Sequence, residues 1–201
     1  MPREALLDAA VGLIAVRGVA GTTSADIAAK AGVTPAMVQY YFRNRELLLD
    51  AVVDERLARF AGHVFGPPLP EGPAAELVSA VVERLYDAAS RMPWMPPIWI
   101  REIVSEGGAL RARMLRHFPV AAATRLGEAI AADQRAGRIA AGIEPRLAFL
   151  TIAGVAMLPL AVRSLWSRLP GLADLDERAL ETHARTVLTA GLAPARKGRR
   201  P

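Results

Sequence analysis

The stretch Thr22–Leu49, TTSADIAAKAGVTPAMVQYYFRNRELLL, decides the fold of this chain. Thr23 and Asp26 form a Thr-x-x-Asp capping pattern, which predicts a helix that begins near Ser24. Gly32 predicts the end of this helix, because a residue just past a helix C-terminus often takes a positive φ that glycine adopts without steric cost. The stretch therefore opens with one short helix followed by a tight turn.

A second short helix follows the turn at once. Thr34 is a suitable N-cap, and Pro35 suits the first helical position, where its missing N–H is not needed. We expect Val38 to face the first helix and Asn44 to cap a third, longer helix that begins at Arg45. Two short helices joined in this way form a helix-turn-helix, whose second helix is the probe that enters the major groove of DNA.

These residues resemble the DNA-binding domain of the tetracycline-repressor-like (TetR) family of bacterial regulators. The resemblance covers Arg3 to about Asp54 and includes the IAAKAGV turn, the aromatic pair before Phe42 and the run RNRELLLDAV. Gln39 stands where the family usually has a tyrosine, and Tyr41 where it usually has a histidine. Both positions lie on the predicted probe surface, so these departures concern the DNA sequence that is recognised and not the fold.

Composition indicates a globular protein with a substantial core. The chain has 201 residues, 52% of them hydrophobic, and no cysteine, which excludes disulfides and thiolate metal sites. The three histidines show no i,i+4 spacing, so we expect neither a metal nor a cofactor. Glu4 and Asp8 interrupt the apolar N-terminus, and the apolar run Leu147–Val162 is shorter than a membrane span and contains Pro159. We therefore expect a cytoplasmic protein in which this run is a buried helix.

The net charge of +5 does not by itself indicate DNA binding. Residues 1–60 hold seven basic and seven acidic residues and are neutral overall. Four of the excess positive charges lie in the tail, residues 194–201, which we expect to be disordered; the alternative is a non-specific phosphate contact. The hypothesis of DNA binding rests instead on the local placement of Arg43 and Arg45 beside the probe helix.

We expect an all-α protein of about nine helices: a three-helix DNA-binding domain at residues 1–46, and a larger ligand-binding and dimerisation domain at 47–193. A helix at about 45–62 connects the two, and the proline-rich residues 66–73 break the chain after it. The remaining helices are expected at about 3–17, 74–91, after Trp99 to 105, 109–136 with a boundary or kink at Pro119, 145–168 with a bend at Pro159, and 176–190 with a stop at Gly191.

The C-terminal sequence also resembles the TetR family, through IEPRLAFL near 143–150 and DERALETHARTVL near 176–188. In that family the last two helices pair with their copies in a second subunit, so the resemblance implies a homodimer. The alternative is that the apolar helix belongs only to the core of its own domain. The implied interface residues are Leu150, Gly154, Leu158, Leu180, His183 and Val187.

The candidate contacts to DNA fall into two groups. Hydroxyls at helix N-termini and one guanidinium are expected to hold phosphates; these candidates are Thr23, Thr34, Tyr40, Tyr41 and Arg45. Residues on the first turns of the probe helix are expected to read bases, with the amide of Gln39 suited to adenine; these candidates are Pro35, Ala36, Met37 and Gln39. The alternatives are that the threonines act only as caps, that Tyr40 is partly buried, and that Met37 points into the core.

Soft and aromatic side chains in the C-terminal part indicate a second, apolar site. Such side chains adapt to varied apolar ligands, and these segments carry few charges, so we expect a hydrophobic or aromatic effector. The alternative for each of these residues is an ordinary place in the core. The candidate pocket residues are Tyr86, Met92, Trp94, Met95, Trp99, Ile103, Met114, His117, Phe118 and Met157.

The sequence thus predicts a ligand-responsive transcriptional regulator, most simply a repressor, that binds a roughly palindromic operator as a dimer and is released by a small apolar effector. The alternative is a helical carrier or sequestering protein for apolar molecules that does not bind DNA specifically. We do not expect an enzyme, because the chain has no G-x-S-x-G, no H-E-x-x-H, no phosphate-binding glycine loop and no plausibly paired carboxylates.

Overall fold

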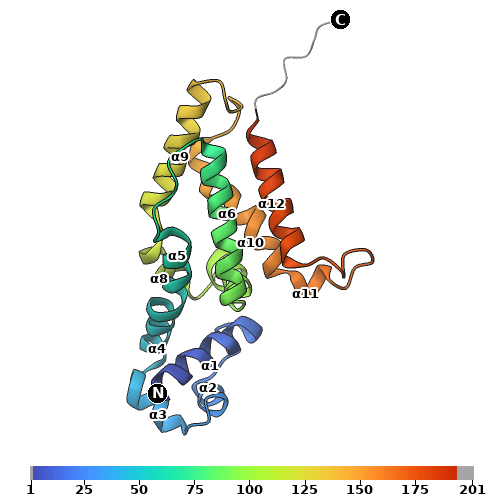
Figure 1. The fold of residues 1–201 in the computed structure, drawn as a ribbon. Coiled ribbons are helices and arrows are strands. Elements are labelled where there is room, and N and C mark those ends of the chain that lie inside the picture. Colours follow the sequence, from blue (N-terminus) through green and yellow to red (C-terminus); the bar gives the residue numbers. More distant parts are fainter. Residues whose placement is uncertain (1, 194–201) are drawn as a thin grey trace, which may run out of the picture. The chain divides into compact units, whose positions relative to one another are not determined.

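The computed structural model describes residues 2–193, and every regular element in that part of the chain is a helix (Figure 1). The all-α expectation is confirmed. The α-helices are α1 (Pro2–Arg17), α2 (Ser24–Lys30), α3 (Pro35–Phe42), α4 (Arg45–Val52), α5 (Ala58–Phe65), α6 (Ala74–Arg91), α7 (Met95–Ile98), α8 (Arg111–Met114), α9 (Val120–Arg135), α10 (Ala148–Ala161), α11 (Arg163–Trp166) and α12 (Glu177–Leu192). Shorter π- and 3-10-helical turns join some of them: η1 (Val53–Leu57), η2 (Trp99–Val104), η3 (Leu115–His117) and η4 (Pro145–Leu147).

The chain forms two compact units. The first comprises Met1–His63 and Ala88–Phe118, and the second comprises Val64–Asp87 and Pro119–Pro201. The functional division expected at residues 46 and 47 stays a prediction, because these units group residues by compactness and not by function. The basic tail lies outside the described residues.

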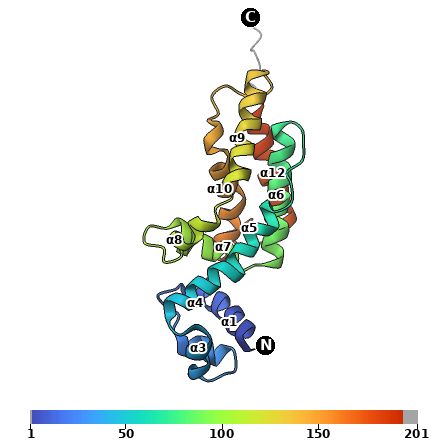
Figure 2. The same ribbon diagram turned by 90° about the vertical axis from the view of Figure 1, so that its left-hand side faces the viewer.

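The first unit is built around α1. Its apolar face is buried, with Leu6, Leu7 and Ile14 almost fully covered, and it packs against both α2 and α4 (Figure 2). Arg56, which is itself buried, donates to Glu4 and Asp8 of α1 at 2.8 Å each. These charge-assisted bonds hold the η1 turn against the N-terminal helix.

The helix expected at 45–62 is not continuous. It contains the π-helical turn η1 between α4 and α5. Trp99–Val104 is likewise π-helical and follows directly on α7. These turns divide helices that a regular 3.6-residue pattern predicts as single elements, which is one reason why the described residues contain more helical segments than expected.

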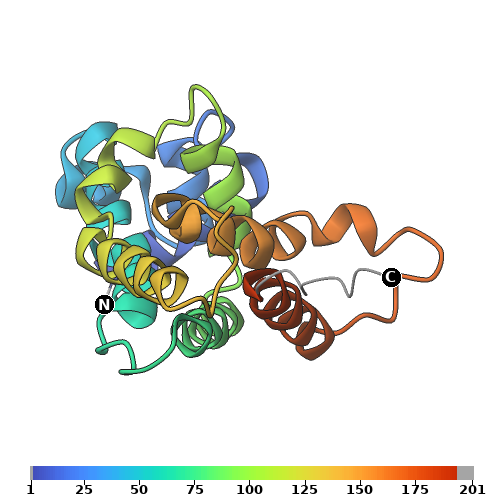
Figure 3. The same ribbon diagram turned by 90° about the horizontal axis from the view of Figure 1, so that it is seen from above.

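The second unit contains α10 in contact with both α9 and α12 (Figure 3). Leu126 and Ile130 of α9 and Ile152 and Ala156 of α10 contribute to its core. At one end of this unit, the N–H of Ala74 donates to the carboxylate of Asp133 at 2.9 Å.

The C-terminal helices decide between two alternatives at Pro119 and depart from expectation at two other places. Pro119 is a boundary and not a kink, so the segment 109–136 contains α8 and η3 and then a separate α9. The helix expected at 145–168 is divided into η4, α10 and α11. Gly191 does not end the last helix; α12 continues to Leu192, and Gly191 is not among the glycines with a positive φ. Glycine permits a helix stop but does not impose one.

The apolar helix α10 is not buried all round. Leu150 is 61% exposed and Leu158 46% exposed in the single chain, whereas Ile152 and Met157 are covered. The expectation of a buried helix is therefore wrong for one chain alone. In the described part of the chain, no helix is both long enough and apolar enough to cross a membrane.

Candidate nucleic-acid interface

The helix-turn-helix is formed by α2 and α3. The hydroxyl of Thr23 accepts from the backbone N–H of Asp26 at 3.1 Å, and the Asp26 carboxylate accepts from the N–H of Thr23 at 2.9 Å, which completes the predicted capping box. The Thr23 hydroxyl also donates to the Asp26 carboxylate at 2.6 Å, and this bond, followed by the bond from the Thr23 N–H, lowers the pKa of Asp26. Gly32 takes a φ of +70° in the turn. The local sequence therefore sets both the start of α2 and its tight exit.

The probe helix α3 is held by few residues and leaves most of its surface open. Val38 and Phe42 are buried, and Val38 takes the inward position that the sequence predicts. Tyr40 is 78% exposed, which answers the alternative that it belongs to the core. Met37 is half-buried. The remaining candidates for base contacts on the probe are exposed, and they are Pro35, Ala36 and Gln39.

Thr34 and Tyr41, two of the candidate phosphate contacts, differ in their exposure. Thr34 has the extended backbone of an N-cap, but its side chain makes no capping hydrogen bond, and it is exposed. Its hydroxyl is therefore not committed to the helix that it precedes. Tyr41 is half-buried and packs edge-on against Tyr40, with 5.1 Å between ring centroids. These positions fit the proposed phosphate role for Thr34 and Tyr40 better than for Tyr41.

Arg45 has a structural role that the sequence did not indicate. Its guanidinium donates to the carbonyl of Thr22 at 2.6 Å and to the carbonyl of Val19. The start of α4 is thereby tied to the turn between α1 and α2. A guanidinium has five N–H donors, so a phosphate contact by Arg45 stays a prediction, but this side chain already has two acceptors.

The same turn is held from its other side by Glu102. This buried carboxylate accepts from the N–H of Val19 at 2.9 Å. Gly18, at a φ of +74°, allows the close approach, since a Cβ there would lie 2.8 Å from a Glu102 oxygen. The peptide groups of Val19 therefore bond to Glu102 through the N–H and to Arg45 through the carbonyl, which joins η2 to the helix-turn-helix.

A row of acids along α4 and η1 is paired with bases from α8 and η3. Arg113 donates to Asp50 at 2.7 Å and also to Glu46. His117 lies 2.7 Å from Asp54, and the pKa of Asp54 is lowered, chiefly by this hydrogen bond with His117. The segment 111–117 is thus fastened to the helix that follows the probe.

The candidate pocket residues fall in both compact units. Tyr86 and Met157 belong to the second unit, and the other eight belong to the first. Met95 and Met157 are buried, Phe118 is 40% exposed, and His117 is engaged by Asp54. Their joint role as an effector pocket stays a prediction.

Tyr86 is exceptional among them. It is buried, and its hydroxyl has no hydrogen-bond partner among the described residues. Burial, and secondarily the charges of Glu181 and Glu177, raise the pKa of this phenol to about 12. The group is therefore a neutral donor, and a buried donor of this kind favours a ligand or water that can accept a hydrogen bond.

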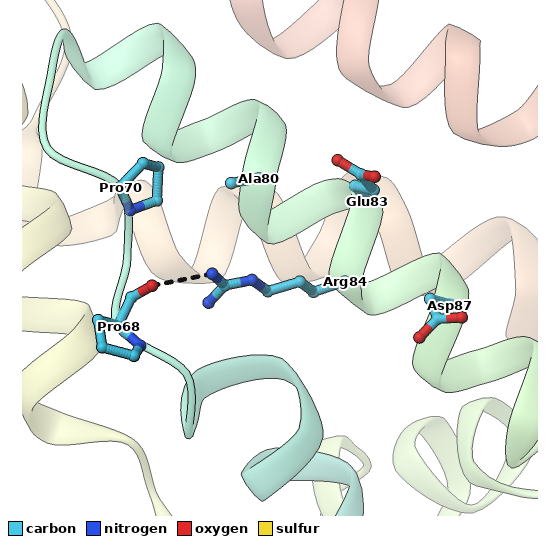
Figure 4. Close-up of a pocket in the computed structure, with 6 residues that line it drawn as sticks. All are labelled: Pro68, Pro70, Ala80, Glu83, Arg84 and Asp87. Atoms are coloured by element: carbon cyan, nitrogen blue, oxygen red, sulfur yellow. Dashed lines mark hydrogen bonds between the residues drawn. The ribbon is translucent and has the colours of Figure 1, made fainter.

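A hollow of about 460 Å³ lies elsewhere in the second unit (Figure 4). None of the candidate pocket residues lines it. Arg84 crosses it and donates to the carbonyls of Pro67 and Pro68 at 2.9 Å each. The arginine thereby fixes the proline-rich connection against α6. The lining residues are Pro68, Pro70, Ala80, Glu83, Arg84 and Asp87.

The candidate interface residues lie on α10 and α12. Leu150, Leu158 and Val187 are exposed apolar side chains, and His183 is also exposed. Leu180 is buried within the single chain, and Gly154 is half-buried with open space where a Cβ would lie. A second subunit stays a prediction for these positions.

Sequence reasoning missed the residues that fasten the probe to its surroundings. Glu46, Asp50 and Asp54 recur every fourth residue, and residues 111–117 are rich in bases, so a signal for complementary charge was present. No sequence rule, however, pairs two segments about 65 residues apart. Glu102 carried no signal at all, because a single acid in an apolar segment does not reveal its partners.

The fold and this site define a class: an all-helical protein with an N-terminal helix-turn-helix and a larger helical region. The family model described as "Bacterial regulatory proteins, tetR family" matches residues 6–52. Over these residues the chain is therefore similar to the TetR family. The resemblance noted in the sequence is thereby confirmed.

Individual relatives agree with this assignment. The chain is 32% identical over 124 residues to the HTH-type transcriptional regulator BetI of Rhizobium meliloti (strain 1021), a match that spans 62% of this chain and 60% of that protein. The chain thus spans less than two thirds of this curated relative.

Solved structures share the fold over almost the whole chain. FadR from Bacillus subtilis, determined in complex with stearoyl-CoA, has a TM-score of 0.67 and 20% identity over 94% of this chain and 98% of its own. FadR from Bacillus halodurans has a TM-score of 0.69 and 21% identity over 95% and 96% of the two chains. Identities this low establish the fold alone.

Proposed function

We propose that this protein is a cytoplasmic transcriptional regulator that binds a roughly palindromic operator as a homodimer and represses transcription until a small apolar effector releases it. The observation that carries the proposal is the probe helix α3, which is packed through Val38 and Phe42 yet exposes Pro35, Ala36, Gln39 and Tyr40. A short helix of this kind is stable only because its neighbours hold it. Exposed side chains on such a helix match the readout geometry of the major groove.

Two probe helices act together in the proposed complex. A two-fold axis places them in successive major grooves, with half-sites about 34–36 Å apart. Gln39 reads one base pair through its amide, and Thr23, Thr34 and Tyr40 hold phosphates that set the position of the helix. The exposed leucines of α10 support the pairing of two chains.

The effector is a hydrophobic or aromatic molecule with at least one hydrogen-bond acceptor. The soft side chains of residues 92–118 support an apolar ligand. In the second unit, the buried hydroxyl of Tyr86, which has no hydrogen-bond partner among the described residues, supports a ligand with an acceptor. The stearoyl-CoA bound to the Bacillus subtilis neighbour is consistent with an apolar ligand, because that ligand carries a long apolar chain.

Release from DNA requires that the effector bind the DNA-free conformation more tightly than the DNA-bound one. The bonds of Arg113 to α4 and of Glu102 to Val19 give a physical route within the first unit. A shift of residues 99–117 acts through them on the start of α4 and on the turn that Arg45 also holds.

The test is a selection of fragments from the native genome by the purified protein, followed by sequencing. We expect enrichment of a two-fold symmetric site. With Gln39→Ala, the preference at one base position in each half-site should relax, whereas Thr124→Ala, an exposed change on α9, should leave the site unchanged. If no fragment is enriched while the protein still binds apolar molecules, it is a carrier and not a regulator.

A further inference from the structure

Arg43 occupies an unusual backbone conformation directly after the probe helix. Its φ is +61°, and it is the only residue other than glycine with a positive φ in the described part of the chain. The chain reverses here so that α3 ends and Asn44 at once caps α4, accepting from the N–H of Leu47 at 2.9 Å. Glycine would make this turn without the steric cost that a Cβ brings.

The side chain of Arg43 is not used by the fold. It is exposed, and no hydrogen bond or ion pair of its guanidinium is found within residues 2–193. Arg45, two residues on, is by contrast bound to two backbone carbonyls. The arginine at position 43 therefore carries a strained backbone and a charge that nothing in the described chain neutralises.

The nearby acids do not compete for this charge. Glu46 and Asp50 are held by Arg113, and Asp26 is held by Thr23 and lies 3.6 Å from Arg17. Arg43 is thus the cation next to the probe that remains available to an anion.

Arg43 directly follows the exposed residues of the probe in the chain. Ala36 and Gln39 or Tyr40 follow each other at a spacing of three or four on α3, and Arg43 comes immediately after the helix as its C-cap residue. Ala36 and Gln39 are base-contact candidates near the start of the probe, and Arg43 is at its end. Phosphates line both edges of a groove, so a residue at the end of a probe helix lies where a strand backbone passes.

We propose that Arg43 makes a phosphate contact that anchors the C-terminal end of the probe helix on DNA, and that Arg45 serves mainly to position the probe. This inference rests on the proposed DNA-binding function and deepens it, because it names a contact residue outside the candidate set. Strain retained at one position is common where a side chain serves binding and not folding.

The test measures binding of a 30-base-pair duplex of randomised sequence across a salt series, which needs no knowledge of the operator. Arg43→Gly and Arg43→Asn remove the charge, and glycine also takes the positive φ without steric cost, whereas Arg43→Lys keeps the charge. We expect the first two to weaken binding about three- to tenfold at low salt and to lower the salt slope by about one unit per bound chain. Arg43→Lys should retain the slope, and Arg135→Gln, which removes an exposed charge from α9, should leave it unchanged.

Thermal stability distinguishes a residue that contacts DNA from one that supports the fold. Arg43→Gly should leave Tm within about 2 °C of the parent, because relief of the turn and greater freedom of the unfolded chain oppose each other. Arg45→Ala should instead lower Tm, because two backbone carbonyls lose their donor. An unchanged slope for Arg43→Gly, or an equal loss for Arg43→Lys, overturns the inference. If the parent protein binds no duplex in a salt-dependent manner, the DNA-binding function itself fails.

Discussion

Asp133 is a buried carboxylate that stabilises one end of the second unit. It accepts from the N–H of Ala74, at the start of α6, and from Arg138 at 2.6 Å. The bond from the Ala74 N–H, and to a smaller extent the bond from Arg138, lower the pKa of Asp133 below its ordinary value. The ionised form is therefore the one that the folded chain prefers.

Replacing Asp133 by asparagine should lower the free energy of unfolding at pH 7 by about 1–3 kcal/mol, because an amide accepts more weakly than a carboxylate. The folded pKa lies below the unfolded one, so the stabilisation is complete above about pH 4–5 and is lost as the pH falls through the folded value. The difference in the free energy of unfolding between the parent and the variant, measured by urea unfolding at pH 7 and then at lower pH, should shrink on acidification.

The control for this measurement is Glu144→Gln. Glu144 pairs with Arg146 in an exposed ion pair, and its pKa is lowered to about 2 by that partner. Exposed pairs of this kind contribute little to stability, so its urea midpoint at pH 7 should match the parent. An Asp133→Asn deficit that persists undiminished at low pH would show that packing, and not charge, is responsible.

At the scale of single residues, local chemistry was predictable and distant partners were not. The Thr23–Asp26 capping box and the Asn44 cap follow from residues three positions apart, and both are present. The sequence predicted only a DNA contact for Arg45. Its guanidinium instead donates to backbone carbonyls that lie more than 20 residues earlier in the chain. No pattern within the sequence encodes that choice between solvent and backbone.

The helix α4 depends on the segment 111–117 for its stability. Arg113 neutralises Glu46 and Asp50, two acids four residues apart on α4 that otherwise repel each other. Arg113→Ala should lower the free energy of unfolding by about 1–3 kcal/mol. It should also speed amide hydrogen exchange in residues 45–52, because local opening of that helix becomes easier.

Arg101→Ala provides the comparison for Arg113→Ala. Arg101 is exposed, and among the described residues it donates only to the carbonyl of Ala15, at 3.3 Å, so exchange in α4 should stay as in the parent. Equal protection of α4 in both variants would mean that the helix is held by its apolar contacts alone.

At the scale of elements, helix breaks were predictable where proline causes them. α6 occupies the expected range after the proline-rich residues 66–73, and Pro119 separates α9 from the turns before it. The π-helical turns were not predictable. They depend on which side chains become buried before and after the turn, and this follows from tertiary packing and not from local sequence. At Gly191 the local sequence predicted a helix end that does not occur, because α12 continues to Leu192.

At the scale of the whole molecule, the exposed leucines of α10 are the feature that the proposed dimer would cover. Leu150→Glu combined with Leu158→Glu should weaken self-association at least about 100-fold, since each buried leucine contributes about 1.5–3 kcal/mol. Analytical ultracentrifugation over a dilution series measures this change. The monomer should also lose its preference for a two-fold symmetric DNA site over a single half-site.

Leu115→Glu is the matched control, because Leu115 is 65% exposed but lies on η3 and outside the candidate interface. Its self-association should equal that of the parent. A parent protein that sediments as a monomer at all concentrations would remove the dimer from the proposal and leave the fold assignment intact.

The π-helical turn η1 places one more residue in its turn than an α-helix would hold. Removing one residue from Val53–Leu57 would let the helix run regularly and leave the part beyond it in nearly the same orientation, because the wide turn already absorbs the surplus residue. What such a deletion would change is the widened turn itself, from which Arg56 reaches the acids of α1. A relative without the surplus residue could therefore keep the course of this helix but would have one side chain fewer to place against its first helix.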